Sequence, residues 1–353
     1  MRLRVLVALG AVLGLALGLW IRPGAHGLPD EFAGDPELAE ALLDEAGTGY
    51  SALAAGVVRD GEVVTASLGA PLAGRFEIGS ITKGVTGLLY ADALERGEIT
   101  EKTRLGELLD LDGTEAADIT LGSLSRQASG LPRLPTSVKS VAKSGAAALL
   151  ARNPYGDSHD DLVRQLRTTD PDDEKPLYSN LGFEALGAAL AEAAGTDYAD
   201  LVRERIAGPL GLDSMTAVVS QDELGDRDVQ GRDKAGRRQQ PWVGEAFSSA
   251  GGIRADIGDM TTLAAALLDG TAPGVAALEP VADFEDGDRI GAAWMTTVQD
   301  DGRTVTWHNG GTGGFMAWMG IDRESGTGVV VLAASSKSVD DVGLALLERE
   351  ATR

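Results

Sequence analysis

Gly79-Ser80-Ile81-Thr82-Lys83 begins a segment whose apolar residues recur at helical spacing as far as Gly97. The sequence therefore predicts a helix that opens at Ser80 and closes before this glycine. Ser80 and Lys83 share one face of that helix, where the amine can take the hydroxyl proton. A serine at the positive end of a helix also has free backbone N–H groups beside it, which favour developing negative charge. The stretch indicates an acyl-transfer nucleophile at Ser80.

The same spacing occurs a second time, at Ser140-Val141-Ala142-Lys143. This stretch lies among serine, lysine and alanine residues, with no glycine before it and no long apolar helix after it. We interpret it as an ordinary surface helix, because the spacing alone is a weak signal.

Composition excludes several classes of function. With 353 residues, of which 43% are hydrophobic, the chain can bury a sizeable core and fits one large or two interlocked domains. A formal net charge of −23 makes nucleic acid a poor partner. The chain has no cysteine and only three scattered histidines, so we expect no disulfide, no metal site and no cofactor.

Residues 1–27 are typical of an export segment. Arg2 and Arg4 precede an uninterrupted apolar run at 5–21, and Arg22-Pro23 follows it. As a helix this run would span roughly 25 Å, slightly less than a bilayer core of about 30 Å, so cleavage and anchoring both remain open. We expect an extracytoplasmic protein, secreted or anchored by residues 5–21, with no other contact with the membrane.

The remaining chain, 28–353, is predicted to be a single catalytic domain of the α/β (mixed α+β) class. Strands are expected at both ends of the chain and helices mainly between them, which implies one sheet assembled from distant segments. Residues 28–104 and 246–353 would form the α/β part, and 105–245 a mainly helical subdomain. Ser80 would face a cleft between the two. The expected strands are 51–58, 62–68, 292–298, 303–307, 315–321 and 328–333, and the clearest helices are 181–194, 198–206, 257–268 and 339–347.

Tyr178-Ser179-Asn180 stands immediately before one of these helices. A tyrosine there can accept a proton at neutral pH only if nearby cations lower its pKa, and Lys83 is the natural candidate. The alternative is structural, with Ser179 or Asn180 capping the helix and Tyr178 packed in the core.

Near the C-terminus a predicted strand ends in the glycine-dense stretch Trp307-His308-Asn309-Gly310-Gly311-Thr312-Gly313-Gly314-Phe315. Such a loop lets the backbone approach a ligand and offer N–H donors. The alternatives are a tight turn between strands and a purely structural His308. Dinucleotide binding is disfavoured because no helix is expected after these glycines.

Taken together, these motifs resemble in order those of the class C β-lactamase and D-alanyl-D-alanine peptidase superfamily. The resemblance spans about residues 40–348 and implies an antiparallel sheet flanked by helices, the β-lactamase/transpeptidase-like fold. The stretches that carry it are Phe76-Glu77-Ile78-Gly79-Ser80-Ile81-Thr82-Lys83, Ser129-Gly130-Leu131-Pro132, Tyr178-Ser179-Asn180, Glu204-Arg205-Ile206-Ala207-Gly208-Pro209-Leu210-Gly211-Leu212, Ser249-Ala250-Gly251-Gly252 and Trp307-His308-Asn309-Gly310-Gly311.

The resemblance implies a role for each matching residue. Ser80 would be acylated, Lys83 would assist its deprotonation, and Tyr178 would carry protons to the leaving group and from the hydrolytic water. The backbone N–H groups of Ser80 and Gly311 would form the oxyanion hole. Further substrate contacts are expected from Asn180, His308, Asn309, Gly310 and Thr312.

Two positions depart from the superfamily pattern. His308 stands where penicillin-degrading class C enzymes have a lysine, and a histidine is only partly charged near pH 7. Gln127-Ala128-Ser129 replaces the usual His-Thr-Ser. The resemblance thus implies a monomeric serine hydrolase that acts on a small-molecule or peptide acyl substrate: a peptide, a β-lactam or an ester. The alternative is a non-catalytic penicillin-binding receptor or scaffold that binds cell-wall peptides.

Overall fold

A computed structural model describes residues 27–29, 31–133, 145, 150–172 and 176–353 of the chain. The predicted export segment, apart from Gly27, and the predicted surface helix at 140–143 lie outside these residues. In the described ranges, no helix combines the length and the apolar character that crossing a membrane requires.

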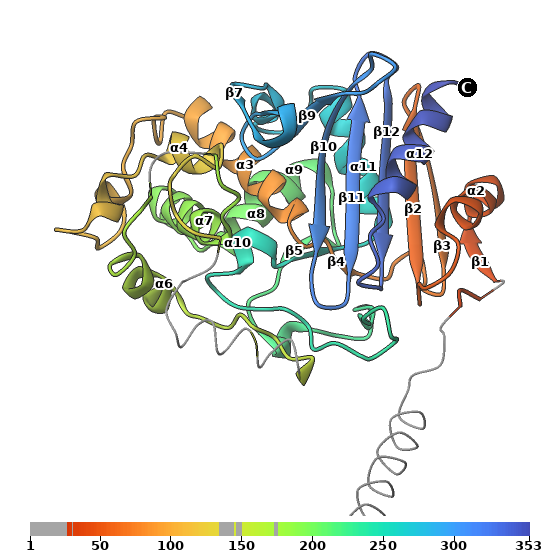
Figure 1. Cartoon of the computed structure of the whole chain (residues 1–353), viewed down its shortest axis with the longest axis horizontal. Coiled ribbons are helices and arrows are strands. Elements are labelled where there is room, and N and C mark those ends of the chain that lie inside the picture. The colour runs from red at the N-terminus through yellow and green to blue at the C-terminus, as the bar shows by residue number, and fades with distance from the viewer. Residues whose placement is uncertain (1–26, 30, 134–144, 146–149, 173–175) are drawn as a thin grey trace, which may run out of the picture.

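One large sheet combines strands from both ends of the chain, as the sequence predicts (Figure 1). All its neighbouring strands are antiparallel. In spatial order its described strands are β1 (Phe32–Gly34), β3 (Glu62–Leu68), β2 (Leu53–Arg59), β12 (Thr327–Ala333), β11 (Met316–Asp322), β10 (Thr304–Gly311), β9 (Met295–Val298), β8 (Arg289–Ile290) and β7 (Ala282–Asp283).

A small second sheet, which the sequence did not indicate, lies beneath the predicted nucleophile. Its strands, in spatial order, are β4 (Phe76–Glu77), β6 (Ile253–Ala255) and β5 (Thr216–Ala217). Strands of two or three residues carry too little alternation to be recognised in a sequence.

Asp60 and Gly61 form the turn between β2 and β3, which lie where the sequence predicts strands. Their φ angles are +51° and +77°, and Arg59 pairs with Glu62 across the turn. Positive φ at both central residues is the geometry that matches the twist of a two-residue hairpin, and it favours the Asp-Gly dipeptide.

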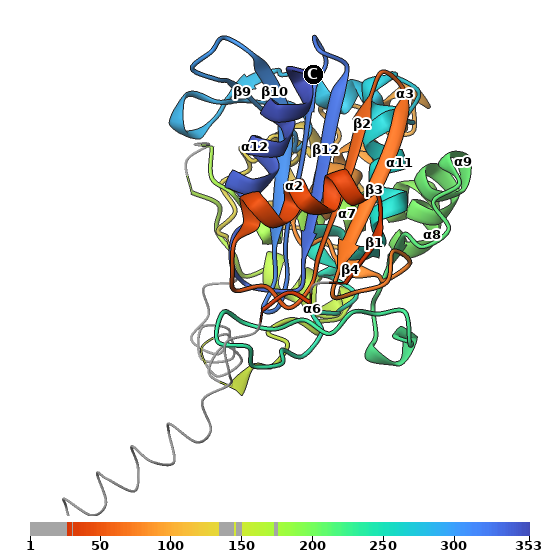
Figure 2. The same ribbon diagram turned by 90° about the vertical axis from the view of Figure 1, so that its right-hand side faces the viewer.

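Helices cover both faces of the large sheet. In Figure 2, α2 and α12 lie in front of the sheet, while α11 lies behind it. The described helices are α2 (Pro36–Ala46), α3 (Ile81–Glu95), α4 (Leu121–Ser125), α6 (His159–Leu166), α7 (Asn180–Ala194), α8 (Tyr198–Val202), α9 (Gly208–Leu210), α10 (Ser248–Gly251), α11 (Ile257–Leu268) and α12 (Asp340–Ala351). Short 3₁₀ or π turns occupy Leu105–Glu107, Glu115–Asp118, Arg203–Ala207, Gln221–Glu223, Val275–Leu278 and Glu285–Gly287.

Alternating side chains of the central strands supply two separate cores. On β2, Ala54 and Val58 pack with α3, α11 and the helical region, whereas Leu53 and Val57 pack with α2 and α12. This alternation follows from the period of two along a strand. Helices α4, α6, α7, α8 and α10 gather beyond β10 at one end of the sheet (Figure 1). The predicted division of the domain at residues 104 and 245 stays a prediction.

Candidate active site

Ser80 occupies the N-cap of α3, and Gly79 immediately before it has a φ of +53°. The Ser80 side chain does not cap its own helix. Its hydroxyl group is instead within hydrogen-bonding distance of the Lys83 amine. The predicted helix is therefore confirmed, and a serine hydroxyl at its start is oriented toward other side chains.

Lys83 lies one helical turn further on and is completely buried. Its Nζ is 3.2 Å from Ser80 Oγ and 2.6 Å from the carbonyl oxygen of Ala250. Burial penalises the charged amine and lowers the pKa of Lys83 from 10.5 to about 7, although the Glu184 carboxylate opposes this shift. A large fraction of the lysine is therefore neutral near pH 7 and able to take a proton from Ser80.

Tyr178 comes from the loop before α7, and its hydroxyl group is hydrogen-bonded to Ser80. The centroid of its ring lies 4.9 Å from Lys83 Nζ. The expectation that Lys83 lowers the pKa of Tyr178 is wrong, because burial of the phenol raises this pKa to about 12. The hydrogen bond with Ser80 and the charge of Arg133 reduce the shift without reversing it. Tyr178 is therefore a protonated phenol, whereas Lys83 can accept a proton near pH 7.

Loop 127–133 holds the Tyr178 loop in place from the other side. The Gln127 side chain accepts a hydrogen bond from Ser179 N at 2.8 Å, and the Gln127 carbonyl accepts one from Leu177 N at 2.8 Å. The Arg133 carbonyl accepts one from Asn180 N at 3.1 Å. Ser179 also caps α7 through Gly182 N, so the predicted structural role of this serine is present as well.

The amide side chain of Asn180 lies at the start of α7. Its Nδ2 donates to the Tyr155 hydroxyl oxygen at 3.0 Å, and its buried Oδ1 has no hydrogen-bond partner among the described residues. The Tyr155 ring stacks on Phe247, with the two ring centroids 3.8 Å apart. An unpaired buried carbonyl oxygen is an acceptor for an N–H group of a ligand.

Strand β10 extends to Gly311, so the first part of the glycine-dense stretch is strand, and the expected loop begins only at Thr312. Gly310 pairs with Ala317 and Gly311 with Met316, so both glycines belong to the sheet. A Cβ atom on Gly310 would lie 2.0 Å from the Ile78 carbonyl oxygen, and one on Gly79 would lie 2.6 Å from Gly311 N. Glycine is needed here because two backbones meet, rather than because the chain turns. This contact places the segment before Ser80 against Gly311. An oxyanion hole formed by the N–H groups of Ser80 and Gly311 requires these two backbones to lie close together.

His308 and Asn309 lie on opposite faces of β10. The His308 ring is buried. Its centroid lies 6.4 Å from the ring centroid of Trp294 and 6.5 Å from that of Tyr178. Burial lowers the pKa of His308 to about 3, so the ring is neutral at physiological pH. The Asn309 amide donates to Asp340 at 3.1 Å, at the start of α12. The structure does not bring the Asn309 side chain to Ser80.

Thr312 follows the strand and is also buried. Its hydroxyl group lies near the Glu77 carboxylate. Burial raises the pKa of Glu77, and the charge of Arg254 and the Thr312 hydroxyl group oppose this rise. Among the described residues, no three His, Cys, Asp or Glu side chains form a cluster suited to a metal ion. The described site therefore consists of Ser80, Lys83 and Tyr178 with the backbone of Gly310 and Gly311, bordered by Asn180 and His308.

The family model described as Beta-lactamase matches residues 39–353 of the chain. The chain belongs to the β-lactamase family. A comparison with curated proteins finds no match.

Several solved structures are similar to this chain. A class C β-lactamase from Rhodobacter sphaeroides is 23% identical with a TM-score of 0.71, covering 89% of this chain and 96% of that one. A D-alanine carboxypeptidase from Burkholderia cenocepacia is 20% identical with a TM-score of 0.72, covering 90% and 99%. An octameric penicillin-binding protein homologue from Pyrococcus abyssi is 19% identical with a TM-score of 0.73, covering 89% and 76%. At these identities the likeness establishes the β-lactamase/transpeptidase fold.

Sequence reasoning missed three contributors to the site. The Ala250 carbonyl belongs to a stretch that resembles the family, but the sequence does not reveal that it binds Lys83. Gln127 was not assigned a role, although it holds the Tyr178 loop. Arg133 directly follows Ser129-Gly130-Leu131-Pro132, and its guanidinium Cζ is 5.5 Å from the Tyr178 ring centroid. Its position after a family motif was the one available signal.

Proposed function

We propose that this chain is an extracytoplasmic serine hydrolase that cleaves an amide or ester through an acyl-enzyme on Ser80. The observation that carries the proposal is the 3.2 Å contact between Ser80 Oγ and a buried Lys83 whose pKa lies near 7. A base with a pKa close to the working pH combines a large neutral fraction with a useful driving force for proton transfer.

In the acylation step, neutral Lys83 takes the hydroxyl proton while Ser80 Oγ bonds to the substrate carbonyl carbon. Negative charge then develops on the carbonyl oxygen. The N–H groups of Ser80 and Gly311 would stabilise this oxyanion, and the first of them also benefits from the positive end of α3. The tetrahedral intermediate next has to expel its leaving group.

Tyr178 fits the role of the acid that completes this step. As a phenol with a pKa of about 12, it keeps its proton until a basic leaving group needs one. Tyr178 gives that proton to the leaving-group oxygen or nitrogen and regains one from protonated Lys83. In the second half of the cycle a water attacks the acyl carbon, gives its proton to the same pair, and Ser80 recovers its hydrogen.

The choice of substrate is narrowed by the neutral state of His308. A residue with a pKa of about 3 offers no positive charge to a substrate carboxylate at neutral pH. This supports a peptidase, amidase or esterase over a dedicated β-lactamase. The unpaired Oδ1 of Asn180 supports acyl groups that carry an N–H donor. We also propose that the enzyme acts as a monomer and is exported by residues 1–27.

Intact-protein mass spectrometry of residues 28–353 tests the proposal. The protein is mixed separately with a fluorophosphonate, a penicillin and a short-chain ester, alongside Ser80→Ala and the matched control Ser140→Ala, which alters the other Ser-x-x-Lys stretch. An adduct that maps to Ser80, persists in Ser140→Ala and is lost in Ser80→Ala supports a serine hydrolase. Ester hydrolysis at the wild-type rate in Ser80→Ala would refute it. Permanent acylation of Ser80 without turnover would favour the alternative, a non-catalytic penicillin-binding receptor or scaffold.

A further inference from the structure

Arg133 places a cation beside the candidate active site. Its side chain is exposed, while its backbone carbonyl is fixed by Asn180 N at 3.1 Å. The guanidinium Cζ lies 5.5 Å from the Tyr178 ring centroid, and Lys83 Nζ lies 4.9 Å from the same point. One tyrosine ring, whose hydroxyl group bonds to Ser80, therefore contacts both basic side chains.

The positive charge of Arg133 is felt within the site. Burial lowers the pKa of Lys83 and the Arg133 charge adds to this effect, whereas burial raises the pKa of Tyr178 and the same charge opposes that rise. The two other basic groups of the site supply no permanent charge, because Lys83 acts in its neutral form and His308 is neutral. Arginine keeps its charge at every physiological pH. Among the described residues that contact Ser80, Lys83 or Tyr178, Arg133 therefore carries a positive charge that does not depend on pH in the physiological range.

The guanidinium of Arg133 also has free hydrogen-bonding capacity. Within the described parts of the chain, no carboxylate forms an ion pair with it. A guanidinium presents a planar fork of N–H donors that matches the two oxygens of a carboxylate. The chain as a whole carries a net charge of −23, which repels anions in general. An anionic substrate would therefore depend on a local cation of this kind.

We propose that Arg133 binds a carboxylate carried by the acyl substrate, so that the site prefers anionic esters or amides to neutral ones. This inference rests on the proposed function and specifies its substrate class. The anion would be bound from the Tyr178 side of the site, by the loop 127–133. The neutral His308 on β10 would take no part in holding it.

A matched pair of esters tests this preference. Mono-p-nitrophenyl glutarate carries a carboxylate, whereas p-nitrophenyl pentanoate has an acyl chain of the same length without one. In the full-length protein, Arg133→Gln should lower kcat/KM for the glutarate at least roughly tenfold more than for the pentanoate, the range expected for hydrogen bonds to a charged group. Arg133→Lys should fall between, because it keeps the charge and loses the fork.

The control is Arg323→Gln, which also removes one positive charge. Arg323 is an exposed arginine that pairs with Glu279. It follows the end of β11 that lies away from Gly311. The Arg323→Gln variant should leave both rates unchanged. The proposal is overturned if the wild-type protein shows no preference for the glutarate, if Arg133→Gln leaves the ratio of the two rates unaltered, or if Arg323→Gln lowers that ratio equally.

A binding measurement separates this inference from the proposed function. Calorimetry on Ser80→Ala with the glutarate ester needs no turnover. Adding Arg133→Gln to this variant should weaken binding at least roughly tenfold. If Ser80 proves not to be a nucleophile and this loss is still observed, the carboxylate site stands without the catalysis. Equal affinity with and without Arg133→Gln would overturn the carboxylate site alone.

Discussion

At the scale of single residues, burial lowers the pKa of both Lys83 and His308, but the consequence at neutral pH differs between them. Both are completely or almost completely buried bases, and burial lowers the pKa of each because it penalises the charged form. For Lys83 the resulting pKa of about 7 produces a proton acceptor suited to neutral pH. For His308 the pKa of about 3 leaves a ring that does not titrate in the physiological range.

The pH dependence of turnover should therefore report Lys83. Acylation requires the neutral amine, so kcat/KM for an ester should rise with pH through a midpoint near 7. A midpoint in this region is usually assigned to histidine. The His308→Gln variant distinguishes the two, since its midpoint should match that of the wild-type protein. A midpoint that disappears in His308→Gln would contradict this assignment.

Replacing the buried lysine should trade activity for stability. Lys83→Met should lower kcat/KM by about 10²–10⁴-fold, the contribution typical of a general base. The Lys83 amine binds its proton less tightly in the native state than in the unfolded chain, because its pKa falls from 10.5 to about 7 on folding. The charged amine therefore destabilises the fold increasingly as the pH falls below about 10. The gain in unfolding free energy of Lys83→Met over wild type should hence be larger at pH 6 than at pH 10, by more than about 1 kcal/mol.

Urea unfolding at the two pH values measures this difference. Lys234→Met is the matched control, because Lys234 is an exposed lysine and its amine stays solvated in both states. It should show the same small effect at pH 6 and pH 10. An equal gain at both pH values for Lys83→Met would mean that the amine is not desolvated in the native protein.

At the scale of elements, the contact between β10 and the start of α3 assembles the site. Both backbones approach so closely that neither Gly79 nor Gly310 has room for a Cβ atom. The sequence predicted α3 and its serine well, because helix periodicity is a local property. The sequence placed the end of β10 too early. Consecutive glycines are typical of a turn, and the contact with Ile78 that explains them in a strand is not visible in the sequence. The pattern alone cannot reveal such a long-range contact.

Gly310→Ala should separate these two elements. Its added methyl group would lie 2.0 Å from the Ile78 carbonyl oxygen, so the strand has to move away from Ser80 and take the Gly311 N–H with it. We expect kcat to fall by about 10²–10³-fold, as for the loss of one oxyanion donor. Ester kinetics with thermal unfolding as a check on folding would measure this.

Gly225→Ala is the matched control for that experiment. A Cβ atom on Gly225 meets nothing within 4 Å, and its φ is not positive. Its kinetics should match those of the wild-type protein. Wild-type turnover in a folded Gly310→Ala variant would show that Gly311 does not help to form the oxyanion hole.

The roles of Tyr178 and Arg133 mark the limit of the sequence at this scale. A Tyr-x-Asn stretch predicted a tyrosine near the nucleophile, and the structure places it there. The direction of its pKa shift could not be predicted, because that depends on how much solvent the surrounding helices exclude. Arg133 belongs to a different loop, and its position over the tyrosine ring arises only when Gln127 and Asn180 join the two loops.

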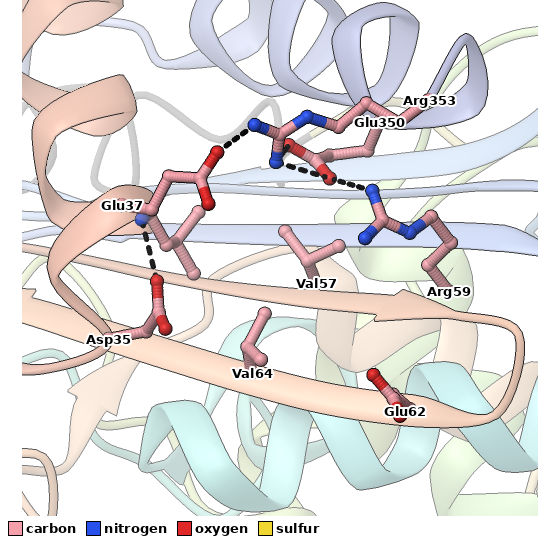
Figure 3. Close-up of a pocket in the computed structure, with 9 residues that line it drawn as sticks. Asp35, Glu37, Val57, Arg59, Glu62, Val64, Glu350 and Arg353 are labelled. Atoms are coloured by element: carbon pink, nitrogen blue, oxygen red, sulfur yellow. Dashed lines mark hydrogen bonds and ion pairs between the residues drawn. The ribbon is translucent and has the colours of Figure 1, made fainter.

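At the scale of the whole molecule, the two ends of the described chain meet on the face of the sheet opposite α3 and α11. A cavity of about 100 Å³ lies there, lined by residues of α2, β2, β3 and α12. Figure 3 shows the side chains that line it. Glu350 of α12 accepts from Arg59 of β2 at 2.9 Å and from Arg353 at 3.2 Å. Arg353 also pairs with Glu37 of α2. These ion pairs join α12 to α2 and to the sheet, away from the reacting groups.

Glu350→Gln should therefore weaken the fold and leave catalysis intact. Glu350 is only 6% exposed, but its arginine partners are partly solvated, so we expect a loss of about 1–2 kcal/mol in unfolding free energy. Urea denaturation measures this loss, with kcat/KM for an ester determined in parallel and expected to stay at the wild-type value. Glu348→Gln is the control, since this more exposed carboxylate lies 3.4 Å from Arg303 and should contribute less than about 0.5 kcal/mol. A fall in kcat/KM for folded Glu350→Gln would show that the α12 face is coupled to Ser80, which this architecture does not predict.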